Sequence, residues 1–128
     1  MAKTTPHGLF IWNELNTRDM EAAKAFYAAT LGWTFTAMPM PEGPDYALIH
    51  SGEAEVGGIF VLDGPECEGV PEHWFSYIAV DDVDERIKGA VAAGGTVLRA
   101  PFDVPEVGRI AIVRDSQGAV AGWMTPTT

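Results

Sequence analysis

One carboxylate stands out in the first apolar stretch of the chain, GLFIWNEL at residues 8–15. The aromatic and β-branched residues of this stretch predict a β-strand, in which Glu14 lies on the same face as Trp12. A charged side chain in such a strand needs a partner. The partners that we consider are Arg109, Tyr77, His73, a neighbouring chain or a ligand. Without a partner in a dry site, the pKa of Glu14 would rise and this residue could act as a general base.

The remaining candidates for chemistry are fewer. The three histidines, His7, His50 and His73, lie at the ends of predicted strands, where we expect solvated or capping side chains. A single cysteine excludes an internal disulfide and a CxxC pair, and its neighbours Glu66 and Glu68 disfavour a reactive thiolate. The sequence contains no GxSxG elbow, P-loop or GxGxxG motif.

Composition bounds the class of protein. The chain has 128 residues and 47% hydrophobic content, which predicts one soluble domain with a core of its own. Eight basic and 18 acidic residues give a net charge of −10, which argues against nucleic acid or an anionic membrane as a partner. The N-terminal residues MAKTTPHG contain no apolar leader segment, and no apolar run reaches membrane-spanning length. We therefore expect a cytoplasmic protein.

Strand-like and helix-like periods alternate along the chain. We expect strands at 8–15, 33–38, 46–51, 56–62, 73–80, 96–100, 109–114 and 119–125, and helices at 19–30 and 81–95. Asp19 is expected to cap the first helix and Gly32 to end it, while Asp82 and Glu85 fit a capping box for the second. The acidic segment 63–72, DGPECEGVPE, is rich in Gly and Pro and is interpreted as a linker.

These elements repeat at an offset of 63 residues. The offset pairs Asp19 with Asp82, Gly32 with Gly95, Ala37 with Ala100, Ile49 with Ile112, and Phe60 with Trp123. It predicts two β-α-β-β-β repeats, about 8–62 and 73–125, within one domain that covers residues 1–128. The predicted fold class is α+β: two βαβββ modules form a curved, incompletely closed eight-stranded sheet with the helices on its convex side.

This duplicated layout resembles the vicinal oxygen chelate superfamily of glyoxalases, extradiol dioxygenases and bleomycin-resistance proteins. The likeness is carried by AAKAFYAATLGW at residues 22–33, VDERIKGAVAAGGTV at 83–97 and RDSQGAVAGW at 114–123. More narrowly, the chain is similar to a single-domain bacterial subgroup described as glyoxalase-like. A fold of this kind hosts many reactions, so the resemblance specifies fold more strongly than function.

Metal-dependent members of the superfamily use His, Glu or Gln ligands on four strands, and the resemblance implies the corresponding positions in this chain. They fall on Trp12, Ile59, Phe75 and Gly122. These side chains offer no donor to a divalent cation, so we expect neither a metal nor another cofactor. Glu14 and His73 are the residues that an unusual metal site would use.

The concave face of the predicted sheet is then an aromatic cup with few polar groups. The ligand-binding residues that we expect there are Trp12, Glu14, Ile59, His73, Phe75, Tyr77, Gly122 and Met124. Such a lining suits a planar or partly apolar small molecule. The alternative is that the aromatic side chains only fill the cup. The loops at 39–45 and 101–108 occupy equivalent places in the two repeats and could rim it.

Three functions are compatible with this site. The first is a binding protein of the bleomycin-resistance type that holds a planar or aromatic small molecule. The second is an enzyme, either a metal-independent lyase or isomerase with Glu14 as its base, or a metal-dependent lyase or dioxygenase with an unusual site. The third is a dimeric scaffold without a ligand. A homodimer is implied by the resemblance in each case.

Overall fold

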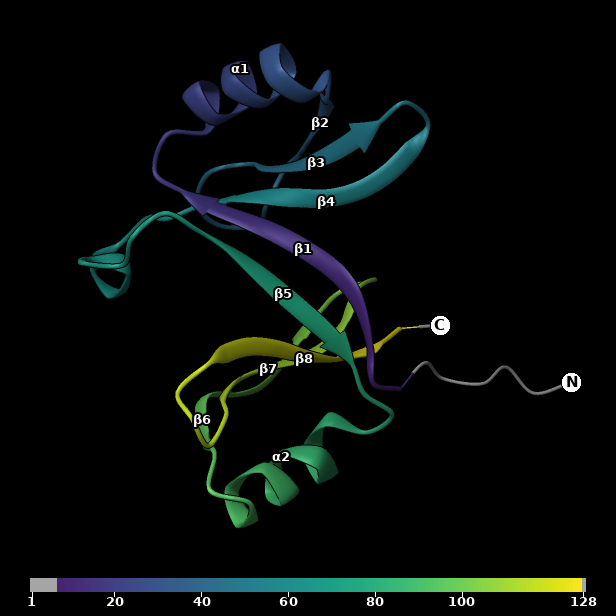
Figure 1. The fold of residues 1–128 in the computed structure, drawn as a ribbon, viewed down its shortest axis with the longest axis vertical. Coiled ribbons are helices and arrows are strands. Elements are labelled where there is room, and N and C mark those ends of the chain that lie inside the picture. The colour runs from purple at the N-terminus through teal and green to yellow at the C-terminus, as the bar shows by residue number, and fades with distance from the viewer. Residues whose placement is uncertain (1–6, 128) are drawn as a thin grey trace, which may run out of the picture. The chain divides into compact units, whose positions relative to one another are not determined.

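The computed structural model describes residues 7–127, which fold into two compact units (Figure 1). The first unit comprises residues 12–75, and the second contains the rest of the described chain. The chain passes between the units within β1 (Leu9–Thr17) and again within β5 (His73–Ala79). Eight strands and two helices in two successive β-α-β-β-β runs confirm the predicted α+β class.

The first unit packs one helix on a mixed sheet. After β1 come α1 (Met20–Leu31), β2 (Thr34–Met38), β3 (Tyr46–Ser51), β4 (Ala54–Val61) and a 3₁₀ turn (Pro65–Cys67). The strand order is β2-β3-β4-β1, with β1 parallel to β4 and the other pairs antiparallel. Its core consists of Leu15, Ala47, Ile49 and Ile59, against which Met20, Ala23, Tyr27, Trp33 and Phe35 pack. Burial of these apolar side chains between α1 and the sheet stabilises the packing of the helix.

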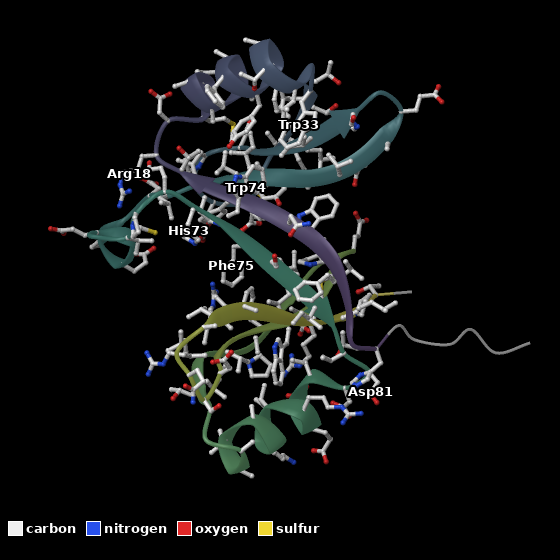
Figure 2. All side chains as sticks on the ribbon, viewed as in Figure 1. Arg18, Trp33, His73, Trp74, Phe75 and Asp81 are labelled. Carbon is white, nitrogen blue, oxygen red and sulfur yellow. The ribbon has the colours of Figure 1, made fainter. Side chains whose placement is uncertain are left out.

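Three aromatic side chains cover the helix side of the same unit. Tyr27 stacks on Trp33 with ring centroids 5.1 Å apart, and Trp74 meets Tyr27 edge-on at 5.7 Å. The Trp74 indole N–H also donates to the Tyr27 hydroxyl at 3.3 Å. Figure 2 labels Trp33 and Trp74. Trp74 thus contacts α1 through Tyr27, although 44% of its surface is exposed.

The second unit repeats this plan. Beyond β5 it contains α2 (Val83–Ala92), β6 (Thr96–Val104), β7 (Gly108–Arg114) and β8 (Val120–Pro126). The strand order is β5-β8-β7-β6, with β5 parallel to β8. Its core consists of Val80, Val83, Ala111 and Val113, with Ile87, Ala90 and Trp123 packed against them. No described helix in either unit has the length and apolar character needed to cross a membrane.

Local capping chemistry fixes the helix ends largely as predicted. The Asp19 carboxylate accepts the backbone N–H of Ala22, and Gly32 ends α1 in the left-handed region at φ 73°. At α2 only half of the predicted capping box is present. The Asp82 carboxylate accepts the N–H of Glu85, but the Glu85 carboxylate binds Lys88 instead of returning to residue 82.

Two sequence-based expectations need correction. The predicted loop at 101–108 is largely strand, because β6 continues to Val104 and leaves only a short turn before β7. The repeat offset is also not constant: it is 63 at the helix N-caps but 64 at β3 and β4. Ala47 and Ala111, which are 64 apart, are both fully buried in equivalent places.

Candidate functional site

Three side chains of the first unit form a chain of hydrogen bonds on the sheet face opposite α1. The Trp12 indole N–H donates to the Tyr46 hydroxyl at 2.9 Å. The Tyr46 hydroxyl in turn donates to Oε2 of Glu14, also at 2.9 Å. Glu14 is only 9% exposed and Tyr46 equally so, which makes this a buried polar network. Glu14 therefore has the partner that its place in an apolar strand requires.

A glycine makes this network possible. In the order β3-β4-β1, the side chain of Tyr46 has to cross β4 to reach Glu14 on β1. The residue of β4 paired with Glu14 is Gly58, and a Cβ atom at that position would overlap the Tyr46 hydroxyl and ring. The absence of a side chain thus opens the path between β3 and β1.

Tyr46 is the member of this network that the sequence analysis missed. Tyr46 begins a predicted strand, but its partner Glu14 lies 32 residues away in the chain, so the local sequence does not indicate this contact. The available signal was a glycine within β4, since glycine inside a strand often marks the close approach of another group.

Ile59, predicted as a ligand-binding residue beside Trp12 and Glu14, lies on the other face of the sheet. It is fully buried beneath α1 and belongs to the core with Leu15, which is its paired residue on β1. The offset of 63 pairs Ile59 with Gly122, whereas the structure requires an offset of 64 here. A shift of one residue reverses the face of every side chain in a strand. Gly58 is the true counterpart of Gly122.

The other predicted residues of the first unit lie on β5. The His73 imidazole is 2.8 Å from the carbonyl oxygen of Pro71 through Nδ1, and its ring meets Phe75 edge-on at 6.2 Å (Figure 2). This bond to the backbone is the capping role expected for a histidine at a strand end.

The predicted residues of the second unit lie on one face of its sheet. Tyr77 pairs with Gly122 in the parallel register of β5 and β8, and Met124 follows two residues later on the same face. Gly122 is buried and Met124 is 8% exposed.

Arg109, the cation considered as a partner for Glu14, is engaged elsewhere in the second unit. Its guanidinium donates to Asp84 at 2.8 Å and to Asp103 at 3.1 Å. The hydrogen bond from Arg109 holds the pKa of the Asp84 carboxyl below its ordinary value, and the two carboxylates raise the pKa of Arg109. This cation is thus a structural link between α2 and the β6–β7 hairpin.

The residues at the family's metal positions do not fit a metal ion. Trp12 and Phe75 have no donor atom for one, Gly122 has no side chain, and the Trp12 N–H already donates to Tyr46. On β4, neither Gly58 nor Ile59 supplies a ligand. Within residues 7–127, no three His, Cys, Asp or Glu side chains come together in a geometry that could hold a metal.

Two successive βαβββ units define the class of fold, and comparison with known proteins gives the family. Residues 9–121 match the family model described as the Glyoxalase/Bleomycin resistance protein/Dioxygenase superfamily. The chain belongs to this superfamily, as the sequence motifs predicted.

Curated relatives are considerably longer than this chain. A Mycobacterium tuberculosis protein named "Putative glyoxylase CFP32" is 44% identical over 119 residues, which are 93% of this chain and 44% of that protein. "Anthracycline biosynthesis protein DnrV" of Streptomyces peucetius is 32% identical over 124 residues, covering 88% of this chain and 45% of that protein. The chain thus spans less than half the length of these relatives.

Solved structures show the same fold at low sequence identity. Methylmalonyl-CoA epimerase from Mycobacterium tuberculosis superposes with a TM-score of 0.67 at 16% identity, over 100% of this chain and 94% of that one. The Mn(II)-bound glyoxalase from Novosphingobium aromaticivorans superposes with a TM-score of 0.62 at 18% identity, over 94% of this chain and 40% of that one. These likenesses concern the fold alone.

Proposed function

We propose that this chain binds a planar, largely apolar small molecule on the sheet face that carries Trp12, Tyr46 and Glu14. The observation that carries the proposal is the hydrogen-bond chain among these three residues. It holds the indole of Trp12 in one orientation, so little conformational entropy is lost when a flat ligand stacks on the ring. Tyr46 and Glu14 supply the few polar groups that such sites use for orientation.

The same geometry favours binding over the alternative in which Glu14 is a catalytic base. The Glu14 carboxylate already accepts a hydrogen bond from the Tyr46 hydroxyl. This bond occupies one of the two carboxylate oxygens and directs it toward Tyr46, which leaves fewer acceptor positions for a proton of a substrate. The absence of donors at the family's metal positions likewise favours a role that needs no metal.

One relative suggests the first probes. DnrV is named for anthracycline biosynthesis, and anthracyclines contain a planar anthraquinone within their four fused rings. The test is isothermal titration calorimetry of the chain with three neutral planar compounds: daunomycinone, menadione and flavone. We expect saturable binding of at least one compound, weakened about tenfold or more by Trp12→Ala. Trp12→Phe retains the ring and should retain most of the affinity.

Trp33→Phe is the matched control, because Trp33 belongs to the aromatic cluster on the helix side of the same unit. It should leave binding unchanged. Failure of all three compounds to bind would overturn the proposal, and so would a Trp12→Ala variant that folds normally and binds as well as the unchanged chain.

A further inference from the structure

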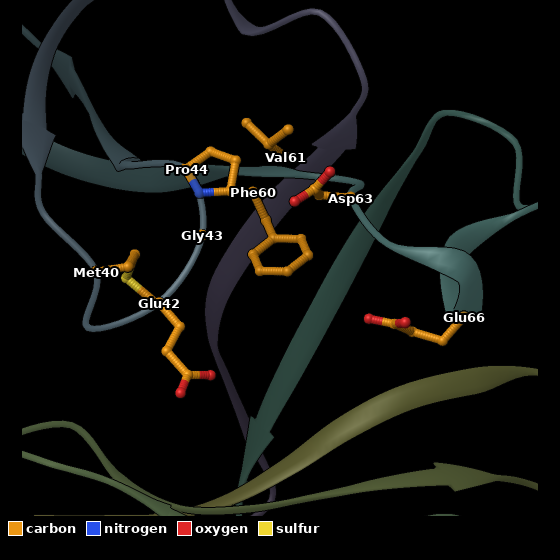
Figure 3. A pocket seen from close by; sticks show the side chains of 8 residues that line it. All are labelled: Met40, Glu42, Gly43, Pro44, Phe60, Val61, Asp63 and Glu66. Carbon is orange, nitrogen blue, oxygen red and sulfur yellow. The ribbon is translucent and has the colours of Figure 1, made fainter.

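A cavity of about 220 Å³ opens in the first unit where β4 ends (Figure 3). It lies between the loop that joins β2 to β3 and the segment that follows β4. Its lining residues are Met40, Glu42, Gly43, Pro44, Phe60, Val61, Asp63 and Glu66. None of Trp12, Tyr46 and Glu14 lines it, so this cavity is separate from the site of the proposed function.

The lining combines an apolar surface with negative charge. Phe60 is 38% exposed and presents its ring between Glu42 and Glu66 in Figure 3, while Met40 and Pro44 supply further apolar contact. The lining contains three carboxylates and no basic residue. An exposed aromatic ring beside carboxylates, in a lining without a basic residue, is the combination that recognises an organic cation, through cation–π attraction and Coulomb attraction together.

The same geometry disfavours a metal ion as the occupant. A hard cation needs several oxygen ligands that converge within about 2.6 Å of one point. In the described part of the chain, no three acidic or histidine side chains converge in this way. The carboxylates are instead spread around an apolar ring, which suits a charge dispersed over an alkylated or protonated amine.

Arg18 holds the acidic side of the cavity in place. Its guanidinium donates to Glu72 at 3.0 Å and to the carbonyl oxygen of Cys67 at 2.8 Å, and its backbone N–H donates to Glu72 at 2.8 Å. These bonds hold the pKa of Glu72 below its ordinary value. They also tie the segment after β4 to the end of β1, so Asp63 and Glu66 belong to an anchored segment.

We propose that this cavity is a binding site for an organic monocation with a small apolar body, such as an aryl-substituted quaternary ammonium group. The net charge of −10 adds a long-range attraction for any cationic ligand. The apolar body would rest on Phe60, and the ammonium group would lie among Glu42, Asp63 and Glu66.

The probe is benzyltrimethylammonium, added to isotopically labelled protein and followed by the amide NMR signals of Gly43 and Gly64. Saturable shifts are expected, and they should weaken as the salt concentration rises. Benzyl alcohol carries the ring without the charge, and tetramethylammonium carries the charge without the ring. Both should bind more weakly than benzyltrimethylammonium.

Variants distinguish binding in this cavity from a general attraction of cations to the acidic protein. Glu66→Gln and Glu42→Gln should each weaken binding by about 1.5- to 5-fold, and Phe60→Leu by about 2- to 5-fold. The matched control is Glu53→Gln, which removes the same charge from the exposed turn before β4. Seven residues of extended chain place Glu53 roughly 23 Å from Phe60, so this variant should bind as the unchanged chain does.

Three results would overturn the inference: no saturable shift, binding of benzyl alcohol as tight as that of the cation, or a loss with Glu53→Gln equal to that with Glu66→Gln. None of these outcomes depends on Trp12. Trp12→Ala should leave binding of benzyltrimethylammonium intact, so failure of this inference and failure of the proposed function are distinguishable.

Discussion

Replacement of Tyr46 by Phe tests the network around Glu14 with the removal of one oxygen atom. The ring can still pack above Gly58, but Glu14 loses a donor and the Trp12 N–H loses its acceptor. A hydrogen bond to a charged group contributes about 1.5–3 kcal/mol, and one between neutral groups about 1 kcal/mol. The free energy of unfolding should therefore fall by about 2–4 kcal/mol, which for a chain of this length lowers Tm by about 8 °C or more.

The matched control removes the same atom from Tyr27. That hydroxyl accepts one long bond, 3.3 Å, from the half-exposed Trp74. Tyr27→Phe should therefore cost no more than about 0.5 kcal/mol. Both variants are measured by urea denaturation, with equal m-values as the check that each unfolds from a comparable native state.

A double-mutant cycle with Glu14→Met then isolates the bond itself. Met is of similar size to Glu and cannot accept the hydroxyl, and the other interactions of Glu14 cancel in the cycle. We expect a coupling energy between Tyr46 and Glu14 of about 1–3 kcal/mol. Additive effects of the two substitutions, or a loss for Tyr46→Phe no greater than that for Tyr27→Phe, would refute the reasoning that this network stabilises the fold.

Three further predictions concern the second unit. Hydrogen bonds from Arg86 lower the pKa of Asp81 to about 2. The stability that this ion pair contributes is therefore present above the ordinary Asp pKa of 3.8 and is lost as the pH falls toward 2. An NMR titration of the Arg86→Met variant should show the pKa of Asp81 returning toward 3.8. Asp82→Ala removes the N-cap of α2 and should lower the free energy of unfolding, measured by urea denaturation, by about 1 kcal/mol. Glu85→Gln should lower it clearly less, because only half of the capping box is formed. Equal losses for the two variants would contradict this assignment. Gly89→Ala should raise the free energy of unfolding by about 1 kcal/mol, since an added Cβ meets nothing within 4 Å in this helix; a lower Tm would show that the site has no such space.

The features that sequence predicted best are those decided by neighbouring residues. Asp19 and Asp82 cap their helices because a short carboxylate reaches backbone N–H groups three residues ahead. Gly32 ends α1 because only glycine adopts its φ of 73° without strain. The homodimer implied by the resemblance depends on contacts between chains, and it stays a prediction.

The error at Ile59 arose where the two repeats differ in length. The pairing of β6 with β7 shifts register between Val97 and Arg99, and again between Arg99 and Phe102. Bulges of this kind absorb extra residues without breaking the sheet. The offset therefore rises by two residues along β6 and is 64 at β3 and β4, so a single offset of 63 pairs Ile59 with Gly122 although these residues lie on opposite faces of their sheets.

Tyr46 shows what would have been needed to predict the site itself. The requirement for a partner followed from the chemistry of Glu14, but the candidates considered did not include a residue of β3. That strand is separated from β1 by β4, and an ordinary side chain on β4 would block the path. The glycine paired with Glu14 removes the obstacle, because a Cβ at Gly58 would overlap Tyr46. The path from Glu14 past Gly58 leads to β3, where Leu48 is paired with Gly58 and Tyr46 lies two residues away.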